Sequence, residues 1–186
     1  MLKIRSRPNA SPITKFIIGV DVSLTSTGIA VVDNMAKIHS VDHIKTSPNK
    51  ADHTRIDYIV DQFFERLRPY INDHTRFVFE AFAFSRNSGK AFTRAEVAGI
   101  IKYKLRQDEY DIIAVSPSAL AKEIAGNGRC GKDGMMQAVF RKYNFYTKIS
   151  DEADALAAAM YGHKLFIEHA PLDFTRHVVF RGRINH

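Results

Sequence analysis

Short apolar runs in the first part of the chain predict a sheet. The runs 16–23 and 28–34 are joined by turn-forming Thr, Ser and Gly residues, which predicts a hairpin. A third strand is expected over 36–45, the segment 76–84 begins as a buried strand, and 111–116 is a short buried strand. We therefore expect three antiparallel strands at the start of the chain and further strands after them.

Apolar residues spaced three and four positions apart predict helices between and after these strands. A helix typically begins where Ser is directly followed by Pro, and it typically ends at Gly. The expected helices are 53–70, 91–107, a helix from Ser116 to Gly126, 134–143, and a last helix capped by Ser150. Strands that alternate with helices predict an α/β layer protein with a mixed sheet flanked by helices.

Composition narrows the class of protein. The 186 residues suffice for one domain with its own core, and 45 % of them are apolar. We expect a basic arm over 1–15, one domain over 16–167 and a basic tail over 168–186. No run of about 20 apolar residues is present for a membrane span, and the chain shows no secretion signal. Together with a single cysteine, this favours a cytoplasmic protein.

Four acidic residues stand beside apolar segments. Asp21 follows an apolar strand, and Glu80 follows the run Arg-Phe-Val-Phe. Asp151 and Asp154 share one face of the last helix, because they are three positions apart. A carboxylate near a core is costly unless its charge is compensated. The four residues therefore predict an oxygen-lined site for Mg²⁺ or Mn²⁺.

Each acidic residue could also have a purely structural role. Asp21 could belong to a turn, Glu80 could lie on the surface, and Asp151 could stabilise a helix N-terminus. The order of strand Asp, strand Glu and helical Asp-x-x-Asp within one small domain is more specific than any single residue.

The net charge of +7 favours a polyanionic partner such as nucleic acid. Two ions about 4 Å apart can hydrolyse a phosphodiester bond.

Several segments resemble the RuvC family of Holliday-junction resolvases, within the RNase H-like superfamily. The similar segments are 19–33 with the first-strand Asp, 79–91 with the Glu, 116–139 with a Pro, Lys, Gly-x-Gly and Lys pattern, and 151–159 with Asp-x-x-Asp-Ala-Leu-Ala. The resemblance covers residues 17–165. It implies an RNase H-like fold and a homodimer that nicks four-way DNA junctions with two Mg²⁺ or Mn²⁺ ions, leaving 5′-phosphate and 3′-hydroxyl ends.

The resemblance also implies roles for individual residues. Asp21, Glu80, Asp151 and Asp154 would be the catalytic, metal-binding carboxylates, and Lys132 would lie close to the scissile phosphate. The family has an aromatic three residues after the Glu, where this chain has alanine between two phenylalanines. The candidate DNA-binding residues are Phe82, Phe84, Arg86, Asn87, Lys90, Arg94, Lys122, Gly126, Gly128 and Arg129. Core packing of the Phe residues and solvation of the basic ones are the alternatives.

A face of small residues in the helix 91–107 could allow a second helix to approach closely. Ala91, Ala95 and Ala98 form this face, and packing on the chain's own sheet is the alternative. A two-fold dimer would match the symmetry of a four-way junction. Three other functions remain open: an RNase H-like nuclease acting on RNA or other branched DNA, an ATPase fragment of the actin-like or sugar-kinase type, and a junction-binding module without catalysis.

Overall fold

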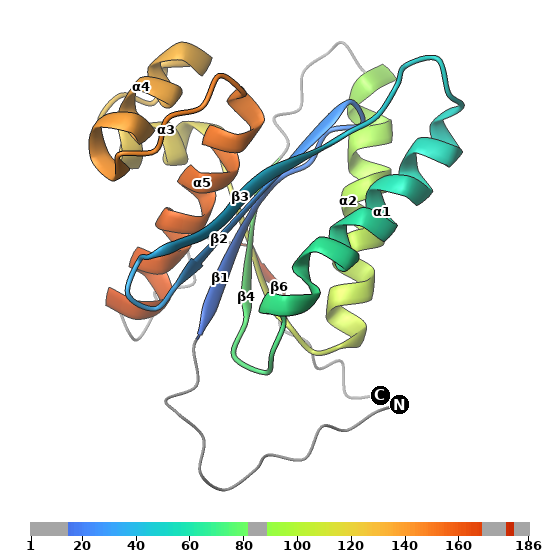
Figure 1. The fold of residues 1–186 in the computed structure, drawn as a ribbon, viewed down its shortest axis with the longest axis horizontal. Helices are drawn as coiled ribbons and strands as arrows, with labels where there is room; N and C mark the ends of the chain where they lie inside the picture. Colours follow the sequence, from blue (N-terminus) through green and yellow to red (C-terminus); the bar gives the residue numbers. More distant parts are fainter. Residues whose placement is uncertain (1–14, 82–88, 169–177, 181–186) are drawn as a thin grey trace, which may run out of the picture.

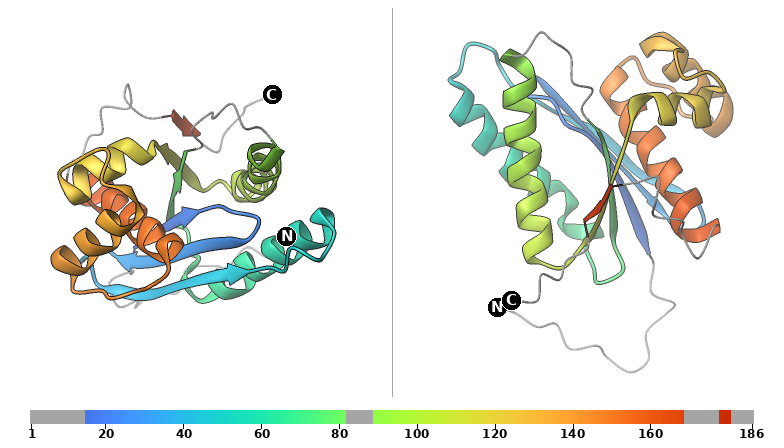
Figure 2. Two further views of the ribbon diagram at one scale, coloured as in Figure 1. Left: turned by 90° about the horizontal axis from the view of Figure 1, so that it is seen from above. Right: turned by 180° about the vertical axis from the view of Figure 1, so that it is seen from behind.

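The computed structural model describes residues 15–81, 89–168 and 178–180, which form three layers (Figure 1). The strands are β1 (Phe16–Asp21), β2 (Ser26–Asp33), β3 (Ile38–Lys45), β4 (Arg76–Glu80), β5 (Asp111–Val115) and β6 (Val178–Phe180). The α-helices are α1 (Asp52–Leu67), α2 (Gly89–Gln107), α3 (Pro117–Ala125), α4 (Gly131–Tyr143) and α5 (Ser150–His163). In both figures of the ribbon, α3, α4 and α5 cover one face of the sheet, and α1 and α2 cover the other (Figure 2).

The sheet has the order β3-β2-β1-β4-β5-β6. Strands β1, β2 and β3 are antiparallel neighbours, whereas β1, β4 and β5 run parallel to one another. This confirms the expected mixed sheet. Strand β6, which pairs antiparallel with β5, comes from the segment predicted as a basic tail and was not expected from the hydrophobic pattern.

Alternation along the strands divides the interior into two cores. Ile17 packs under α3, α4 and α5, and its neighbour Ile18 packs under α1 and α2. Successive strand residues point to opposite faces, so strands buried on both faces are apolar throughout. None of the helices in the described ranges is both long and apolar enough to cross a membrane.

Several boundaries differ from the sequence-based expectation. Strand β1 ends at Asp21 and strand β2 begins at Ser26, so the hairpin turn lies two residues earlier in the chain than predicted. Helix α4 begins at Gly131, which places Lys132 in its first turn and not in a glycine-rich loop. Helix α5 has Ile149 at its N-cap, so Ser150 is the first helical residue and not the cap. Ser116 is confirmed as the N-cap of α3, since its hydroxyl accepts a hydrogen bond from the Ala119 amide.

The predicted small-residue face of α2 is split between interior and surface. Ala98 is buried in the core beneath α1 and α2, whereas Ala95 is exposed. The side chain of Ala91 is outside the described part. The buried face of α2 is formed by Val97, Ala98, Ile101 and Leu105.

Helix α5 lies unusually close to the sheet. Its residues 155–159 are all fully buried, and four of these five are alanine. Glycines on the strands below leave room for the helix backbone. A Cβ added at Gly19 would lie 2.0 Å from the Ala155 carbonyl oxygen, and one at Gly28 only 1.9 Å from that of Asp151. These two glycines therefore fix the height of α5 above β1 and β2.

Candidate active site

Two adjacent parallel strands end in acidic residues. In the register of β1 and β4, Val20 lies beside Phe79, so the next residues, Asp21 and Glu80, emerge at the same edge of the sheet. Carboxyl ends of neighbouring parallel strands are the usual place for ligands in α/β sheets. Both predicted strand carboxylates therefore occupy a position suited to a site.

The start of α5 brings two more acidic residues to this edge. Asp21 is paired across the β1–β2 hairpin with Gly28, and the bare face of Gly28 lies directly against the Asp151 backbone. The helix turn carrying Asp151 and Asp154 therefore lies over the end of β1. Residues from opposite ends of the domain are brought together in this way.

Burial and mutual repulsion perturb three of these carboxyl groups. Asp21 is only 5 % exposed, and burial together with the charges of Glu80 and Asp154 raises its pKa well above the usual range. Burial and the charge of Asp154 raise the pKa of Glu80 to about 7. Burial also raises the pKa of Asp154 to about 6, although Lys132 opposes the shift. Carboxylates this close are not all ionised at neutral pH unless positive charge compensates them.

Two basic side chains supply part of that compensation. Arg94 donates from Nε to the Val22 carbonyl at 2.9 Å, and its Nη2 lies 3.4 Å from Asp21 Oδ1. Lys132 Nζ donates to Ser150 Oγ at 3.1 Å. The positive charge of Lys132 opposes the rise in the pKa of Glu80 that burial causes. Arg94 thus contacts the acidic cluster itself, whereas the sequence suggested a phosphate contact beside it.

The donor set fits a divalent cation. Clustered carboxylate oxygens on rigid elements are the ligands that Mg²⁺ and Mn²⁺ prefer, and burial strengthens their demand for positive charge. No three of the four acidic residues, all of which lie in the described part, bring their oxygens within 4.8 Å of one another.

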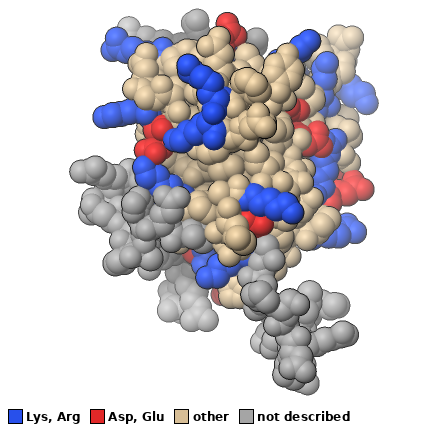
Figure 3. All heavy atoms as spheres, turned by 60° about the vertical axis from the view of Figure 1, so that its left-hand side comes forward, with Lys and Arg blue, Asp and Glu red and all other residues tan. Residues whose placement is uncertain are grey.

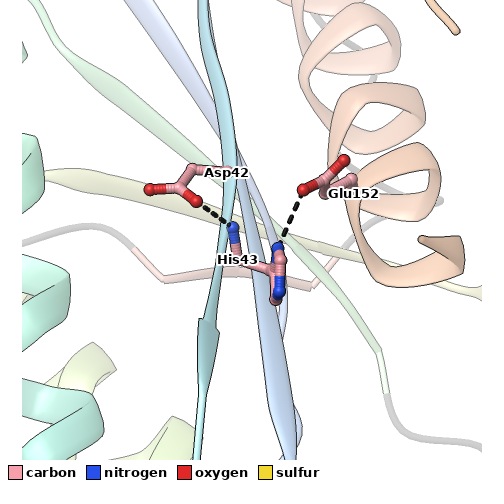
Figure 4. A group of neighbouring side chains, drawn as sticks. All are labelled: Asp42, His43 and Glu152. Carbon is pink, nitrogen blue, oxygen red and sulfur yellow. Dashed lines mark hydrogen bonds and ion pairs between the residues drawn. The ribbon is translucent and has the colours of Figure 1, made fainter. Parts of the chain in front are cut away.

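A different group does bring its possible ligand atoms within 4.8 Å: Asp42, His43 and Glu152. Figure 4 shows His43 on β3 directed toward Glu152 on α5, while Asp42 points away from α5. His43 Nδ1 lies 2.8 Å from Glu152 Oε1, and Glu152 Oε2 accepts a 2.6 Å hydrogen bond from the Thr147 hydroxyl. No sequence motif indicates that His43 belongs near the acidic turn.

A cleft of about 490 Å³ opens beside the acidic cluster. Glu80, Asp154 and Lys132 line it, together with Gly128 and residues at the start of α3. A Cβ on Gly128 would lie 3.2 Å from the Ser118 carbonyl oxygen, so the chain passes close to α3 here. Gly126 ends α3 with φ 75°, a conformation that glycine adopts easily.

The other predicted DNA-binding residues fall into two groups. Lys122 and Arg129 are exposed near the turn between α3 and α4. Phe82, Phe84, Arg86 and Asn87 lie outside the described residues, and Lys90 lies in α2 with its side chain undescribed. Figure 3, which brings the α3, α4 and α5 side forward, shows Lys and Arg distributed around the face with Asp and Glu among them.

Three features of the site escaped the sequence reasoning. Gly28 is predicted only as the residue where the turn meets the return strand, although a glycine within a strand commonly marks a close backbone approach. Ser150 was assigned as a cap but contacts Lys132. The contact of Arg94 with Asp21 joins residues far apart in the chain, so no local pattern could have indicated it.

The three-layer arrangement and the strand order are those of the RNase H-like fold. The family model described as "Crossover junction endodeoxyribonuclease RuvC" matches residues 17–162, and the chain belongs to this family. This confirms the resemblance and the nuclease class seen in the sequence.

Individual relatives agree with the assignment. The chain is 29 % identical over 150 residues to a crossover junction endodeoxyribonuclease RuvC of Brachyspira hyodysenteriae, covering 77 % of this chain and 90 % of that protein. It is 25 % identical over 151 residues to the protein of the same name from Parasynechococcus marenigrum, covering 78 % and 96 %. Thermus thermophilus RuvC, solved in complex with a Holliday junction substrate, has the same fold with TM-score 0.68 at 20 % identity, covering 81 % and 94 %.

Proposed function

We propose that this chain resolves four-way DNA junctions by metal-dependent phosphodiester hydrolysis, acting as a homodimer. The observation that carries the proposal is the acidic edge of the sheet. There, burial raises the pKa values of Asp21 and Glu80 on adjacent parallel strands and of Asp154 on α5, and the charge of Asp154 adds to the rise at Asp21 and Glu80. Structural packing alone would not favour three carboxyl groups in one buried place.

Asp21, Glu80, Asp151 and Asp154 would hold one or two Mg²⁺ or Mn²⁺ ions. Such ions, when bound, activate water and stabilise the leaving oxygen. Asp21 and Glu80 lie at the ends of paired strands, so they would contribute oxygens from rigid positions. Asp151 and Asp154 would contribute oxygens from the first two turns of α5.

Lys132 is suited to a role at the scissile phosphate. It lines the cleft beside Glu80 and Asp154 and is held by Ser150. An ammonium group in this place would stabilise negative charge that develops on the phosphate oxygens. Lys122 and Arg129, exposed beyond the cleft, would contact the DNA backbone without reading its sequence.

The homodimer is supported by an apolar stripe on α2. Phe92 is 73 % exposed and Tyr103 is 58 % exposed, and Ala95 and Gly99 lie exposed between them. These positions recur on one side of the helix, and an exposed apolar stripe is typical of a helix that packs on a partner. A second copy with the same stripe would form a two-fold contact that matches the symmetry of a four-way junction.

One cleavage experiment tests the proposal. Four-way, three-way, flap and linear DNA and an RNA–DNA hybrid are incubated with the protein, with and without Mg²⁺. We expect paired nicks in the four-way junction that require the metal and can be sealed by a ligase. Preferred cleavage of the hybrid or of linear DNA would contradict junction resolution and leave another nuclease of the same fold.

The matched control uses Asp154→Asn, which keeps the shape of the side chain and removes its charge. This variant should bind the junction as the wild type does and fail to cut it. Cutting by Asp154→Asn at the wild-type rate would indicate a contaminating nuclease or would exclude Asp154 from the site.

A further inference from the structure

We propose that His43, Glu152 and Thr147 form a latch that positions the acidic turn of α5 over the end of β1. The latch is defined by two contacts: His43 Nδ1 to Glu152 Oε1 at 2.8 Å, and Thr147 Oγ1 to Glu152 Oε2 at 2.6 Å. The inference rests on the proposed function, because it assigns a positioning role toward the same metal-binding carboxylates.

The latch ties α5 to the edge of the sheet. His43 lies on β3, the outermost strand on that side, and Glu152 lies in the first turn of α5, between Asp151 and Asp154 in the sequence. Glu152 is 13 % exposed and His43 25 % exposed, so both side chains are largely withdrawn from water. A hydrogen-bonded carboxylate in such a place holds its geometry better than an exposed pair.

The contacts also argue against a second metal site formed by Asp42, His43 and Glu152. Adjacent strand residues point to opposite faces, and Asp42 is directed away from α5 (Figure 4). Asp42 pairs with Arg66 of α1, and its other oxygen accepts the His43 amide at 2.7 Å. Both oxygens of Glu152 are likewise engaged by His43 and Thr147.

The mechanical consequence concerns Asp151 and Asp154. The first turn of a helix has few backbone hydrogen bonds of its own, so it depends on side-chain contacts for a fixed position. Gly28 sets how closely this turn approaches the sheet, and the latch restrains it sideways toward β3. Loss of the latch should therefore weaken metal binding by the neighbouring carboxylates without removing any ligand.

Four variants test whether the hydrogen bonds of the latch, and not the charge of Glu152 alone, position the turn. Glu152→Ala and Glu152→Gln remove the same charge, but only the glutamine can accept from His43 and donate to the Thr147 hydroxyl. His43→Ala removes the contact and keeps the charge of Glu152. The control is His39→Ala, because His39 Nε2 lies 2.8 Å from Asp33 Oδ2 with nearly equal exposure (26 % and 11 %). This contact lies at the other end of β3 and joins it to β2 and not to α5.

The first measurement is Mn²⁺ binding to the DNA-free protein by titration calorimetry. We expect Glu152→Ala and His43→Ala to raise the Kd about tenfold, the usual cost of losing a contact that orients a metal ligand. Glu152→Gln should recover most of this loss, and His39→Ala should leave the Kd unchanged. Equal losses in Glu152→Gln and Glu152→Ala would overturn the latch and indicate that the charge of Glu152, or its own ligation, matters.

The second measurement is hydrogen exchange of the amides in the first two turns of α5, without metal. His43→Ala should speed exchange there, whereas His39→Ala should not. Unchanged protection in His43→Ala would overturn the latch. If the wild type bound no Mn²⁺, the proposed metal dependence would fail, and the exchange measurement would still decide the latch.

Discussion

Gly28→Ala tests whether the close approach of α5 to the sheet is required for the site. The new Cβ would lie 1.9 Å from the Asp151 carbonyl oxygen, and ordinary contact begins at 3.4 Å, so the helix turn must move by about 1.5 Å (3.4 minus 1.9). A misplacement of about 1 Å can cost roughly 100-fold in rate. We therefore expect single-turnover cleavage of a saturating four-way junction to fall at least about 100-fold.

Gly162→Ala is the matched control for this substitution. Its Cβ would lie 2.4 Å from a methyl group of Val78, so it also overpacks α5, at the end of the helix away from the acidic turn. Both variants should lose about 1–3 kcal/mol of unfolding free energy, measured by urea denaturation. Only Gly28→Ala should lose cleavage per folded molecule. Equal cleavage rates for the two variants would refute the argument that Gly28 sets the position of Asp151.

The contacts of the site support three more predictions, and the exposed stripe of α2 supports a fourth. Glu80→Gln should bind junctions and fail to cut them, as a gel-shift and cleavage pair would show; cutting at the wild-type rate would exclude Glu80. Lys132→Ala should slow single-turnover cleavage more than it weakens junction binding, whereas proportional losses would indicate an ordinary backbone contact. Arg94→Ala should tighten Mn²⁺ binding in calorimetry, because it removes a positive charge beside Asp21; weaker binding would contradict this. Phe92→Glu should shift the protein to monomer in light scattering, and an unchanged mass would exclude the α2 stripe as the interface.

The sheet and most helices could be predicted from the sequence because their signals are local. Short apolar runs indicate buried strands, and apolar residues three and four positions apart indicate the buried side of a helix. The structure confirms the predictions made in this way for β1, β5 and α1. The short strand β6 could not be recognised in this way, because three residues carry too little pattern and its pairing with β5 is a tertiary contact. The start of α4 was misplaced because its first residues include two glycines, which usually indicate a loop.

The acidic residues were predictable for a different reason. Asp21 and Glu80 stand out because a carboxylate directly after a buried strand is costly, and Asp154 stands out before a run of alanines. The contacts that position them were not predictable. His43 lies on an edge strand among alternating polar residues, and nothing near it in the sequence indicates that its partner is 109 residues away.

The start of α5 directs neighbouring acidic side chains toward two different parts of the sheet. Successive helical residues are rotated by about 100°, so residues three apart share a face and the two residues between them point elsewhere. Asp151 and Asp154 therefore both lie toward the ends of β1 and β4, while Glu152 reaches sideways to His43 on β3. The two spaced acids are the part that a pattern of residues can identify. The proposed role of Glu152 depends on its contact with His43 of the edge strand β3, and this contact exists only in the folded chain.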